Sequence, residues 1–508
     1  MSTSVIPKKR LSPSSGKPWK PLAYQKRSIK FLLERAHGGL LLNPGGRKTS
    51  ITLATLKILF TQKMIRKVLV IAPKRPCYTV WPGEIEKWSD FNHLTYTILH
   101  GSKKDEALKI DAQIYIINPA GLMWLLGATK TKVPKQYIDK FTGEKKFTMK
   151  TVVQIDMKRF KSFGFDVLVV DELTAFKNQS SDRYKLMKEV LPTFARRWGL
   201  TGSVAANGLM DLFGQCYVLD MGRTLGRFIT HYRKEYFDSD YHEVNWTIKP
   251  GGEQRIYERL APLMLRIEPD EMGVELPQLV QNIIEIELPD DARRIYDDLE
   301  KKMLADINGS KFVASNAASV SSKCRQVASG GIFHYPEPVP GQRQAPREMV
   351  QLHDAKTEAL LELVEELQQS PILVAYDFEH DLERLRRAFP KAVFTCDVEI
   401  KKFRAVEDKW NAGDIPVLFG HPQSIGHGLN LQGASHNVAW YTLTYDFEFY
   451  DQFNRRVLRS GNTTLRVFVH HLLAKNTIDF LIYDILNAKD KGQQALFKGL
   501  QELAKGIR

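Results

Sequence analysis

The feature that most constrains the fold is the stretch 38–51, GGLLLNPGGRKTSI, in which an apolar run, a glycine-rich turn and a Lys-Thr pair follow one another. The apolar run at 40–42 predicts a short buried strand, and residues 49–60 predict a helix. A strand, a glycine-rich turn, Lys-Thr and a helix, in this order, are typical of a phosphate-binding loop. The stretch therefore predicts a site for a polyphosphate such as ATP.

Five consecutive residues of this loop are the predicted ligands. The backbone N–H groups of Gly45, Gly46 and Arg47, the positive end of the helix and the Lys48 ammonium would converge on a polyphosphate. Thr49 is placed to offer its hydroxyl to Mg²⁺. One residue departs from the pattern, because the position before Lys48 is normally glycine and here is Arg47. The interpretation therefore depends on whether the rest of the chain supports nucleotide hydrolysis.

Apolar segments alternate with helical segments along the chain. KVLVIAP, YTILHG, AQIYIINPAGL and FDVLVVDEL are expected strands, and their alternation with helices indicates a parallel sheet covered on both faces. Ligands of such sheets bind at the carboxyl ends of the strands. The residues that fall at these ends are Lys48, Pro73, Asn118 and Asp171.

The same pattern returns after residue 350, with PILVAYD, KAVFTC, VLFGHP and HNVAWYT as strand candidates. The predicted fold class is α/β, with two lobes that each hold a mostly parallel sheet flanked by helices. Mostly helical, loop-rich structure is expected around 225–350. The predicted parts are a disordered basic tail (1–20), a first lobe (21–270), a linking helical or loop region (271–350) and a second lobe (351–508).

An insert at about 130–162 interrupts the first lobe. Two alternating segments flank Thr142-Gly143, as in a β-hairpin, and seven lysines lie between Lys130 and Lys150. The hairpin is either a solvated surface element or a contact for the DNA backbone.

Asp171 and Glu172 directly follow the apolar run VLVV. Two adjacent acids at the end of a buried strand are unfavourable without a counter-charge, which a phosphate-bound Mg²⁺ would supply. Asp171 would then hold the metal, and Glu172 would orient and deprotonate the attacking water. The alternative is a pair that merely caps the next helix. WGLTGSVAAN ends another strand, where Thr201 and Ser203 either couple the nucleotide site to a nucleic-acid track or cap a turn.

Two further groups of residues fit a nucleotide site. Gln25 lies on a helix expected to begin near Pro21; it is either an exposed residue or an amide that reads the adenine edge. Arg456 and Arg459 are three positions apart, so on a helix they would share a face, with Gln452 one turn before Arg456. They are either an exposed basic helix or arginine fingers for the γ-phosphate.

Composition narrows the class of partner. The 73 basic and 58 acidic residues give a net charge of +15, which favours a polyanionic partner, nucleic acid before membrane. The four cysteines are scattered, without metal-ligand spacing, so a structural zinc is not expected. No apolar window approaches a membrane span and no signal peptide is visible. A cytoplasmic protein is expected.

The motifs follow one another in a specific order: YQ, NPGGRKTS, IAPKRP, INPAGL, VVDELTAFKN, LTGSVAANGLMDLFGQ, ILVAYDFEHDLERL, GHGLNLQGASHNVAWY and YDQFNRRVLRSGN. As a set they resemble superfamily 2 helicases (DEAD/DEAH-box-like), and among these the Swi/Snf-type ATP-dependent DNA translocases, particularly small phage-borne ones. The resemblance covers roughly residues 20–486. It implies two RecA-like lobes with an ATP cleft between them and DNA across their top.

The resemblance also implies roles. Gln25 would read adenine, and Lys48 and Thr49 would hold phosphate and magnesium. Asp171 would be the metal ligand and Glu172 the water activator. In the second lobe, Arg456 and Arg459 would be the arginine fingers and Gln452 a nucleotide ligand. The loop linking DNA to the cleft would include Gly426, Gly428, Leu429 and Asn430.

Three positions depart from the family pattern. Arg47 replaces a glycine, and its Cβ would crowd the loop. Val204 stands where the family usually has proline. Leu173 and Thr174 replace the more familiar end of the Asp-Glu box.

The predicted function is an ATP-dependent DNA helicase or translocase, phage-encoded, that acts in replication, recombination or repair in the bacterial host cytoplasm. Its expected cofactors are ATP and Mg²⁺, and its expected partners are double- or single-stranded DNA and other replication or recombination proteins. One alternative, suggested by Arg47, is a nucleic-acid-binding scaffold or regulator that no longer hydrolyses ATP. Another is an RNA helicase.

Overall fold

The computed structural model forms two compact units, Met1–Gly273 with Gln493–Arg508 and Val274–Gly492. The structure describes residues 16–43, 45–138, 145–202, 205, 208–240, 246–268, 270–273, 276–308, 314–334, 348–368, 370–425, 429–459, 462 and 464–506.

The first unit contains a seven-stranded sheet with the order β11-β1-β8-β7-β2-β4-β3, and all its neighbouring strands are parallel. Its strands are β1 (His37–Leu42), β2 (Val68–Ile71), β3 (Tyr96–Ile98), β4 (Ile114–Ile117), β7 (Val167–Asp171), β8 (Arg196–Thr201) and β11 (Met264–Ile267). The helices are α1 (Ala23–Glu34), α2 (Lys48–Thr61), α3 (Lys74–Tyr78), α4 (Val80–Lys87), α5 (Lys104–Lys109), α6 (Leu122–Leu125), α7 (Met157–Ser162), α8 (Asp182–Val190), α9 (Leu212–Asp220), α10 (Ile229–Tyr236) and α11 (Gly252–Leu260).

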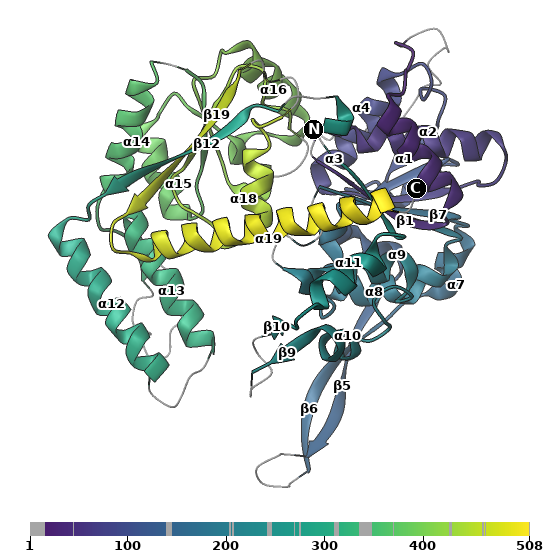
Figure 1. Ribbon diagram of the computed structural model, residues 1–508, viewed down its shortest axis with the longest axis horizontal. Coiled ribbons are helices and arrows are strands. Elements are labelled where there is room, and N and C mark those ends of the chain that lie inside the picture. Colours follow the sequence, from purple (N-terminus) through teal and green to yellow (C-terminus); the bar gives the residue numbers. More distant parts are fainter. Residues whose placement is uncertain are drawn as a thin grey trace. The chain divides into compact units, whose positions relative to one another are not determined.

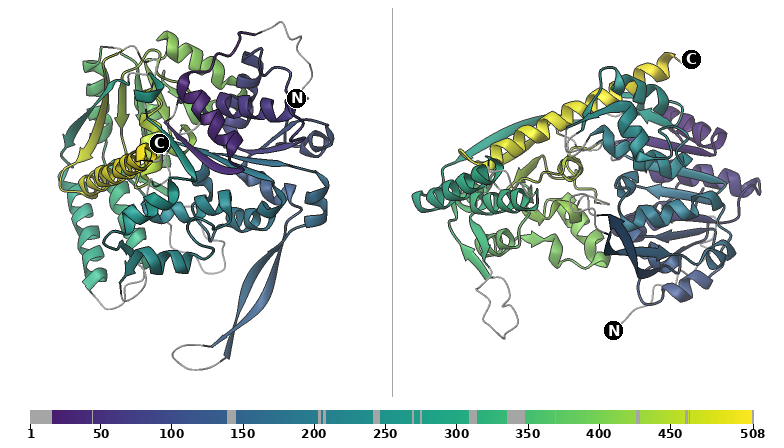
Figure 2. Two further views of the ribbon diagram at one scale, coloured as in Figure 1. Left: turned by 45° about the vertical axis from the view of Figure 1, so that its right-hand side comes forward. Right: turned by 90° about the horizontal axis from the view of Figure 1, so that it is seen from below.

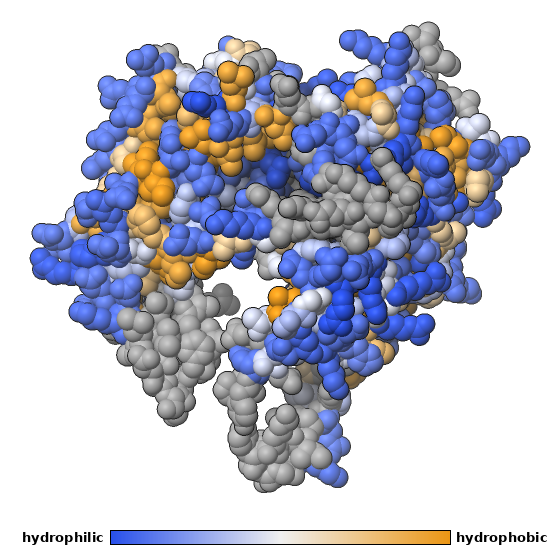
Figure 3. Space-filling view, in the orientation of Figure 1, coloured by the Kyte–Doolittle hydropathy of each residue, from blue (hydrophilic) through white to orange (hydrophobic). Residues whose placement is uncertain are grey.

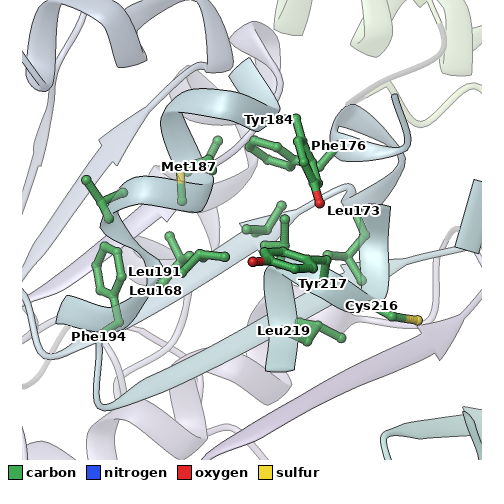
Figure 4. Close-up of a cluster of buried hydrophobic side chains, with 14 of the residues drawn as sticks. Leu168, Leu173, Phe176, Tyr184, Met187, Leu191, Phe194, Cys216, Tyr217 and Leu219 are labelled. Atoms are coloured by element: carbon green, nitrogen blue, oxygen red, sulfur yellow. The ribbon is translucent and has the colours of Figure 1, made fainter. Parts of the chain in front are cut away.

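Helices cover both faces of this sheet. In Figure 1, α1, α2 and α4 lie on one side of β1 and β7, while α7, α8 and α9 lie on the other. The interior strands β2 and β4 are buried throughout, because a parallel sheet between two helical layers has no solvated face. Side chains of β7, α8 and α9 meet in a core cluster on one of these faces (Figure 4). This buried core holds the strands in place, and with them the sheet edge at which their carboxyl ends lie.

Two small antiparallel ribbons also belong to the first unit. One pairs β9 (Phe237–Ser239) with β10 (Trp246–Ile248). The other pairs β5 (Thr129–Ile138) with β6 (Lys145–Gln154) and extends away from the sheet, as Figures 1 and 2 show. The expected hairpin is confirmed for these strands, while its turn at Thr142-Gly143 lies outside the described residues. Residues 157–162 form α7 rather than part of the hairpin.

The second unit contains a six-stranded parallel sheet with the order β12-β19-β18-β15-β17-β16. Its strands are β12 (Gln278–Ile286), β15 (Ile372–Ala375), β16 (Val393–Phe394), β17 (Val417–Gly420), β18 (Asn437–Trp440) and β19 (Arg466–Ala474), and a separate pair joins β13 (Gly331–His334) to β14 (Glu348–Gln351). The helices are α12 (Asp290–Asn308), α13 (Ala314–Ser329), α14 (Ala355–Glu366), α15 (Glu379–Ala388), α16 (Phe403–Ala412), α17 (Pro422–Ile425) and α18 (Phe447–Asn454). The last helix, α19 (Ile478–Gly506), begins in the second unit, and its residues from Gln493 onward belong to the first.

The α/β prediction with two mostly parallel sheets is confirmed. The expectation of mostly helical structure around 225–350 missed β11 and β12, each of which is an edge strand of one sheet. Of the expected basic tail, residues 1–15 lie outside the described residues. Residues 16–20 are described, and the Trp19 N–H donates to Asp90 Oδ2 at 2.8 Å. Among the helices that the structure describes, none is long and apolar enough to cross a membrane.

Candidate functional site

The phosphate loop leaves the carboxyl end of β1 and enters α2. Gly45 has a φ of +89°, in the region that favours glycine. The Gly46 N–H donates to the Asn43 carbonyl at 2.9 Å. A Cβ at Gly46 would lie 2.9 Å from Leu42 Cβ and 3.0 Å from the Asn43 oxygen, which is too close for another residue without a shift. Both glycines are therefore needed for the path of this loop.

Arg47 is the residue that departs from the usual loop sequence. It takes the left-handed conformation, with φ 54° and ψ 38°, immediately before α2 begins. Glycine is usual here because other residues pay a steric cost in this region. The Arg47 side chain is exposed, and its charge opposes the burial that raises the pKa of Tyr24. The Arg47 substitution therefore strains the backbone but leaves its side chain at the surface of the loop.

Lys48 and Thr49 open the first turn of α2. The Lys48 ammonium donates to the Leu42 carbonyl at 2.9 Å, so it is folded back over the loop. Thr49 is buried. The charge of Lys48 also acts on the Asp171 carboxyl, whose pKa it lowers. The lysine of the loop and the acid at the end of β7 thus belong to one electrostatic site.

Asp171 accepts a hydrogen bond from a tryptophan that no sequence motif predicted. Trp81 is fully buried on α4, and its Nε1–H donates to Asp171 Oδ2 at 2.9 Å. Burial raises the pKa of Asp171 above its usual value, whereas the hydrogen bond from Trp81 and the charge of Lys48 act in the opposite direction. Because Trp81 fixes one carboxylate oxygen, the orientation of the group is set before any ligand binds.

Glu172 has an unusual backbone and two hydroxyl donors. Its φ is 82°, which is rare for a residue with a side chain. Glu172 Oε1 accepts hydrogen bonds from Thr201 Oγ1 at 2.7 Å and from Thr174 Oγ1 at 3.1 Å. Thr201 ends β8, which lies between β1 and β7 in the sheet. Thr201 therefore lies between the phosphate loop and the acidic pair, and Thr174, a departure from the family pattern, contributes a contact of its own.

Gln25 is fully buried on α1, so the alternative of an exposed helix residue is wrong. Its Oε1 accepts a hydrogen bond from the Leu22 N–H at 2.8 Å. Its Nε2 is buried and has no hydrogen-bond partner among the described residues. A buried amide donor without a partner is costly, so this atom is suited to a ligand.

Arg266 is a buried residue of β11 that sequence reasoning missed. Its Nη1 donates to Asn43 Oδ1 at 3.2 Å, while its Nε and Nη2 donate to the two carboxylate oxygens of Glu268 at 2.9 and 3.2 Å. Arg266 therefore links Asn43, at the start of the phosphate loop, to Glu268, the residue that follows β11. The signal was the basic residue inside the apolar strand MLRI.

In the second unit, Arg456 and Arg459 lie close together but not on a helix. The prediction that they share one face of a helix is therefore wrong. The helix α18 ends at Asn454, and the following residues form turns. Both arginines are buried, and their Nη1 atoms donate to the same carbonyl, that of Leu429, at 3.0 and 2.8 Å. What brings the pair together is a shared acceptor rather than helical spacing.

A polar network surrounds this pair. Arg459 Nη1 donates to Asn430 Oδ1 at 2.7 Å, and Asn430 Nδ2 donates to Glu407 Oε1 at 3.0 Å. Burial lowers the pKa of Arg459 to about 10, with Glu407 acting in the opposite direction. Gln452 donates to Glu448 Oε1 at 3.2 Å, and its own Oε1 is buried without a hydrogen-bond partner among the described residues. Ser203, Val204, Gly426 and Gly428 lie outside the described residues.

Two comparisons with known proteins identify the family of this chain. A family model described as the SNF2-related domain matches residues 24–328. A putative protein, p41, of Acyrthosiphon pisum secondary endosymbiont phage 1 is 30% identical over 498 residues, which cover 96% of this chain and 99% of that protein. The chain belongs to the SNF2-related family. The predicted family and enzyme class are thereby confirmed, and one relative of this SNF2-related chain is a phage protein.

Other relatives are longer proteins. An uncharacterized ATP-dependent helicase of Mycoplasma pneumoniae is 25% identical over 356 residues, which cover 67% of this SNF2-related chain and 31% of that protein. The human DNA annealing helicase and endonuclease ZRANB3 is 23% identical over 503 residues, which cover 95% of this chain and 41% of that protein. The chain thus spans less than half the length of these two relatives.

Proposed function

We propose that the chain is an ATP-dependent DNA translocase or helicase that couples ATP hydrolysis to movement on DNA in replication, recombination or repair. The observation that carries this proposal is the arrangement at the ends of β7 and β8. There Glu172 takes a strained conformation and accepts hydroxyl hydrogen bonds from Thr201 and Thr174. Beside it, Asp171 is oriented by a hydrogen bond from Trp81, and the charge of Lys48 lowers the pKa of its carboxyl group against the effect of burial. Strain of this kind gathers at functional sites.

In this proposal, different residues of the first unit contact different parts of ATP. The loop N–H groups at 45–47 and the Lys48 ammonium bind the phosphates, and the buried Gln25 Nε2 donates to the adenine. Thr49 and Asp171 offer the hard oxygen ligands that Mg²⁺ prefers; the ion, when bound, neutralises charge on the phosphates. Glu172 orients the attacking water and accepts its proton.

The residues of the second unit keep, in this proposal, the roles that the family resemblance implies. Arg456 and Arg459 are the arginine fingers in this proposal, and the unpartnered Gln452 oxygen accepts a hydrogen bond from the ligand. Arg459 keeps its charge at neutral pH, since its pKa is about 10. Both arginines now donate to the Leu429 carbonyl, so reaching a γ-phosphate requires exchanging that partner. Leu429 and Asn430 would thereby sense the state of the nucleotide.

The partner that suits this chain is DNA, in keeping with the name of the ZRANB3 relative and with the net charge of +15. Other replication or recombination proteins would join it. The phage relative supports action in the cytoplasm of a bacterial host.

Phosphate release in the presence of duplex DNA, single-stranded DNA or RNA tests the proposal. Turnover should rise with DNA at low salt and more than with RNA of the same sequence. Stimulation by RNA alone would replace the proposal with an RNA helicase. Equal turnover with and without every nucleic acid would contradict both.

A second candidate, a scaffold that binds nucleic acid without hydrolysing ATP, is favoured by one observation, the left-handed Arg47. The retention of Lys48, Asp171 and Glu172 argues against it, since a decaying site should have lost some of them. A wild-type chain that already hydrolyses ATP removes this candidate. An inactive wild type that gains turnover with Arg47→Gly would establish it.

A further inference from the structure

The ribbon of β5 and β6 is an arm whose base is fixed to the first unit. Its two strands pair from Thr129 opposite Gln154 to Ile138 opposite Lys145. At the base, Val153 packs against the core cluster of the first unit. Lys130 Nζ also lies 2.5 Å from Asp182 Oδ2 on α8. The ribbon beyond this base extends past the helices of its unit, as both figures show (Figures 1 and 2).

One face of the ribbon combines apolar and basic side chains. Residues paired directly across two strands share a face, which places Met149 opposite Pro134 and Phe147 opposite Gln136. Phe147 is 70% exposed and Met149 is 58% exposed. Because every second residue of a strand returns to the same face, the remaining positions of this face include the exposed Lys132 and Lys145.

The exposure of Phe147 and Met149 calls for a partner. Lysines and a proline on an isolated ribbon can be understood as protection of its open edges against pairing with other chains. An exposed aromatic residue and an exposed methionine have the opposite effect, because they make a flat strand prone to association. Figure 3 shows that hydrophobic residues also occur elsewhere on the surface, so a single exposed side chain would carry little weight. Here two exposed apolar side chains, Phe147 and Met149, lie on the same face of one isolated ribbon.

The charge of the ribbon identifies the partner. Between residues 129 and 154 there are seven lysines and two acidic residues. Basic side chains interleaved with an exposed aromatic ring match the chemistry of nucleic acid, in which lysines bind phosphates and the ring stacks on a base. We propose that the β5–β6 ribbon is a DNA-binding arm, with Lys132 and Lys145 on phosphates and Phe147 stacked on a base. This proposal rests on the proposed function and adds a contact surface to it.

The lysine part is tested by the salt dependence of binding to a fluorescein-labelled DNA duplex and to its single strand. The double variant Lys132→Gln/Lys145→Gln removes two phosphate contacts, so the slope of log affinity against log salt should decrease by about 1.8 for the duplex. The control Lys103→Gln/Lys109→Gln removes the same charge from exposed positions at α5 in the same unit. A loss of slope equal to the control would overturn the proposal, because it would reflect net charge rather than the ribbon.

The aromatic part is tested by Phe147→Ala and Phe147→Trp in the full chain. Loss of one stacked base should weaken DNA binding by about tenfold while the salt slope stays unchanged. The added indole of Phe147→Trp should be quenched when DNA binds. Phe228 is the matched control, since it is 56% exposed in the same unit. Phe228→Ala and Phe228→Trp should show neither effect.

The outcomes separate the two proposals. If wild-type chain binds DNA but Phe147→Ala binds as tightly and the Phe147→Trp signal is unchanged, the arm is overturned and the translocase stands. If the wild-type chain shows neither DNA binding nor DNA-stimulated turnover, the proposed function itself fails. All three ribbon variants change exposed side chains, so each should unfold at the same temperature as the wild type, and a loss of binding can be assigned to the contact.

Discussion

Two residues with side chains take left-handed backbone conformations at the candidate ATP site. Arg47 does so in the phosphate loop and Glu172 at the end of β7. Each conformation costs about 1–2 kcal/mol in a residue other than glycine. For Glu172 the surrounding hydroxyls of Thr201 and Thr174 hold the strained geometry in place. The Arg47 side chain is exposed, so no comparable contact is expected to offset the strain of its backbone.

Replacing Arg47 with glycine should stabilise the chain. Arg47→Gly removes the steric cost of a φ of 54°, so the free energy of unfolding should rise by about 1 kcal/mol in urea titrations. Lys63 is the matched control, because it has a φ of 57° just after α2, at the other end of that helix. Lys63→Gly should stabilise by a similar amount.

The rate of ATP turnover should distinguish Arg47, in the phosphate loop, from Lys63, at the far end of α2. Lys63→Gly should leave turnover unchanged, and Arg47→Gly should alter it only a few-fold if Arg47 is a tolerated variant. A drop in stability with Arg47→Gly would show that the arginine side chain makes net favourable contacts, contrary to this account.

Thr201 should act as a positioning residue for Glu172. Thr201→Val keeps the shape but removes the hydroxyl that donates to Glu172 Oε1. A hydrogen bond to a charged group is worth about 1.5–3 kcal/mol, so kcat for ATP should fall about 10- to 100-fold. KM should change little, since Glu172 acts on water rather than on bound ATP.

Thr201→Ser, which keeps a hydroxyl, should restore most of the turnover. Steady-state kinetics in the presence of DNA measure all three proteins. Equal loss in Thr201→Val and Thr201→Ser would point to packing of the methyl group rather than to the hydrogen bond.

At the scale of elements, the strands were the most predictable part. Runs rich in Val and Ile, such as those of β2 and β7, appear where they were expected. The end of α18 was not predictable, because the periodic pattern continues past Asn454. After Asn454 the chain continues in tighter turns, in which the Arg456 N–H donates to the Phe453 carbonyl at 3.0 Å. The Arg456 carbonyl accepts from the Leu431 N–H at 3.2 Å, a contact between residues far apart in sequence.

The edge strand β12 was missed for a similar reason. Its partner β19 is 188 residues away, since Gln278 pairs with Arg466. Its side chains alternate between exposed and half-buried, so no continuous apolar run marks it. Contacts of the site such as Trp81 with Asp171 depend on the same long-range packing. Sequence motifs therefore identified the reactive side chains but not the residues that orient them.

Two buried histidines of β19 should make the stability of the second unit depend on pH. His470 and His471 are buried there, and burial lowers the pKa of each to about 4. His471 Nε2 lies 2.8 Å from the Tyr450 hydroxyl and Nδ1 lies 3.3 Å from the Asn282 carbonyl. A neutral ring satisfies both contacts, with the hydroxyl donating to Nε2 and Nδ1–H donating to the carbonyl.

Acidification should therefore destabilise the fold. The unfolded chain binds protons below pH 6.5 and the folded histidines bind them only near pH 4, so stability is full above 6.5 and is lost as the pH falls toward 4. Between pH 7 and pH 5 the loss should be about 2 kcal/mol for each histidine. Urea unfolding at the two pH values measures it. His471→Gln should reduce the loss, whereas His231→Gln, at an exposed position of α10, should not.

At the scale of the whole molecule, the order of motifs was enough to predict the family, now confirmed. The residues predicted to bind ATP are found in both units: the loop, acids and Gln25 in the first, the arginines and Gln452 in the second. Sequence order says which residues belong to each lobe but not how one lobe meets the other. The ATP cleft between the lobes therefore stays a prediction. ATP turnover is the activity that such a cleft would produce.

The central claim is that the residues around the phosphate loop hydrolyse ATP in response to DNA. The most direct test compares DNA-stimulated phosphate release and ATP binding in wild type, Glu172→Gln and Lys48→Ala. The account predicts turnover in wild type only, with ATP binding kept by Glu172→Gln and weakened by Lys48→Ala. Turnover by Glu172→Gln at the wild-type rate, or a wild type that DNA does not stimulate, would contradict it.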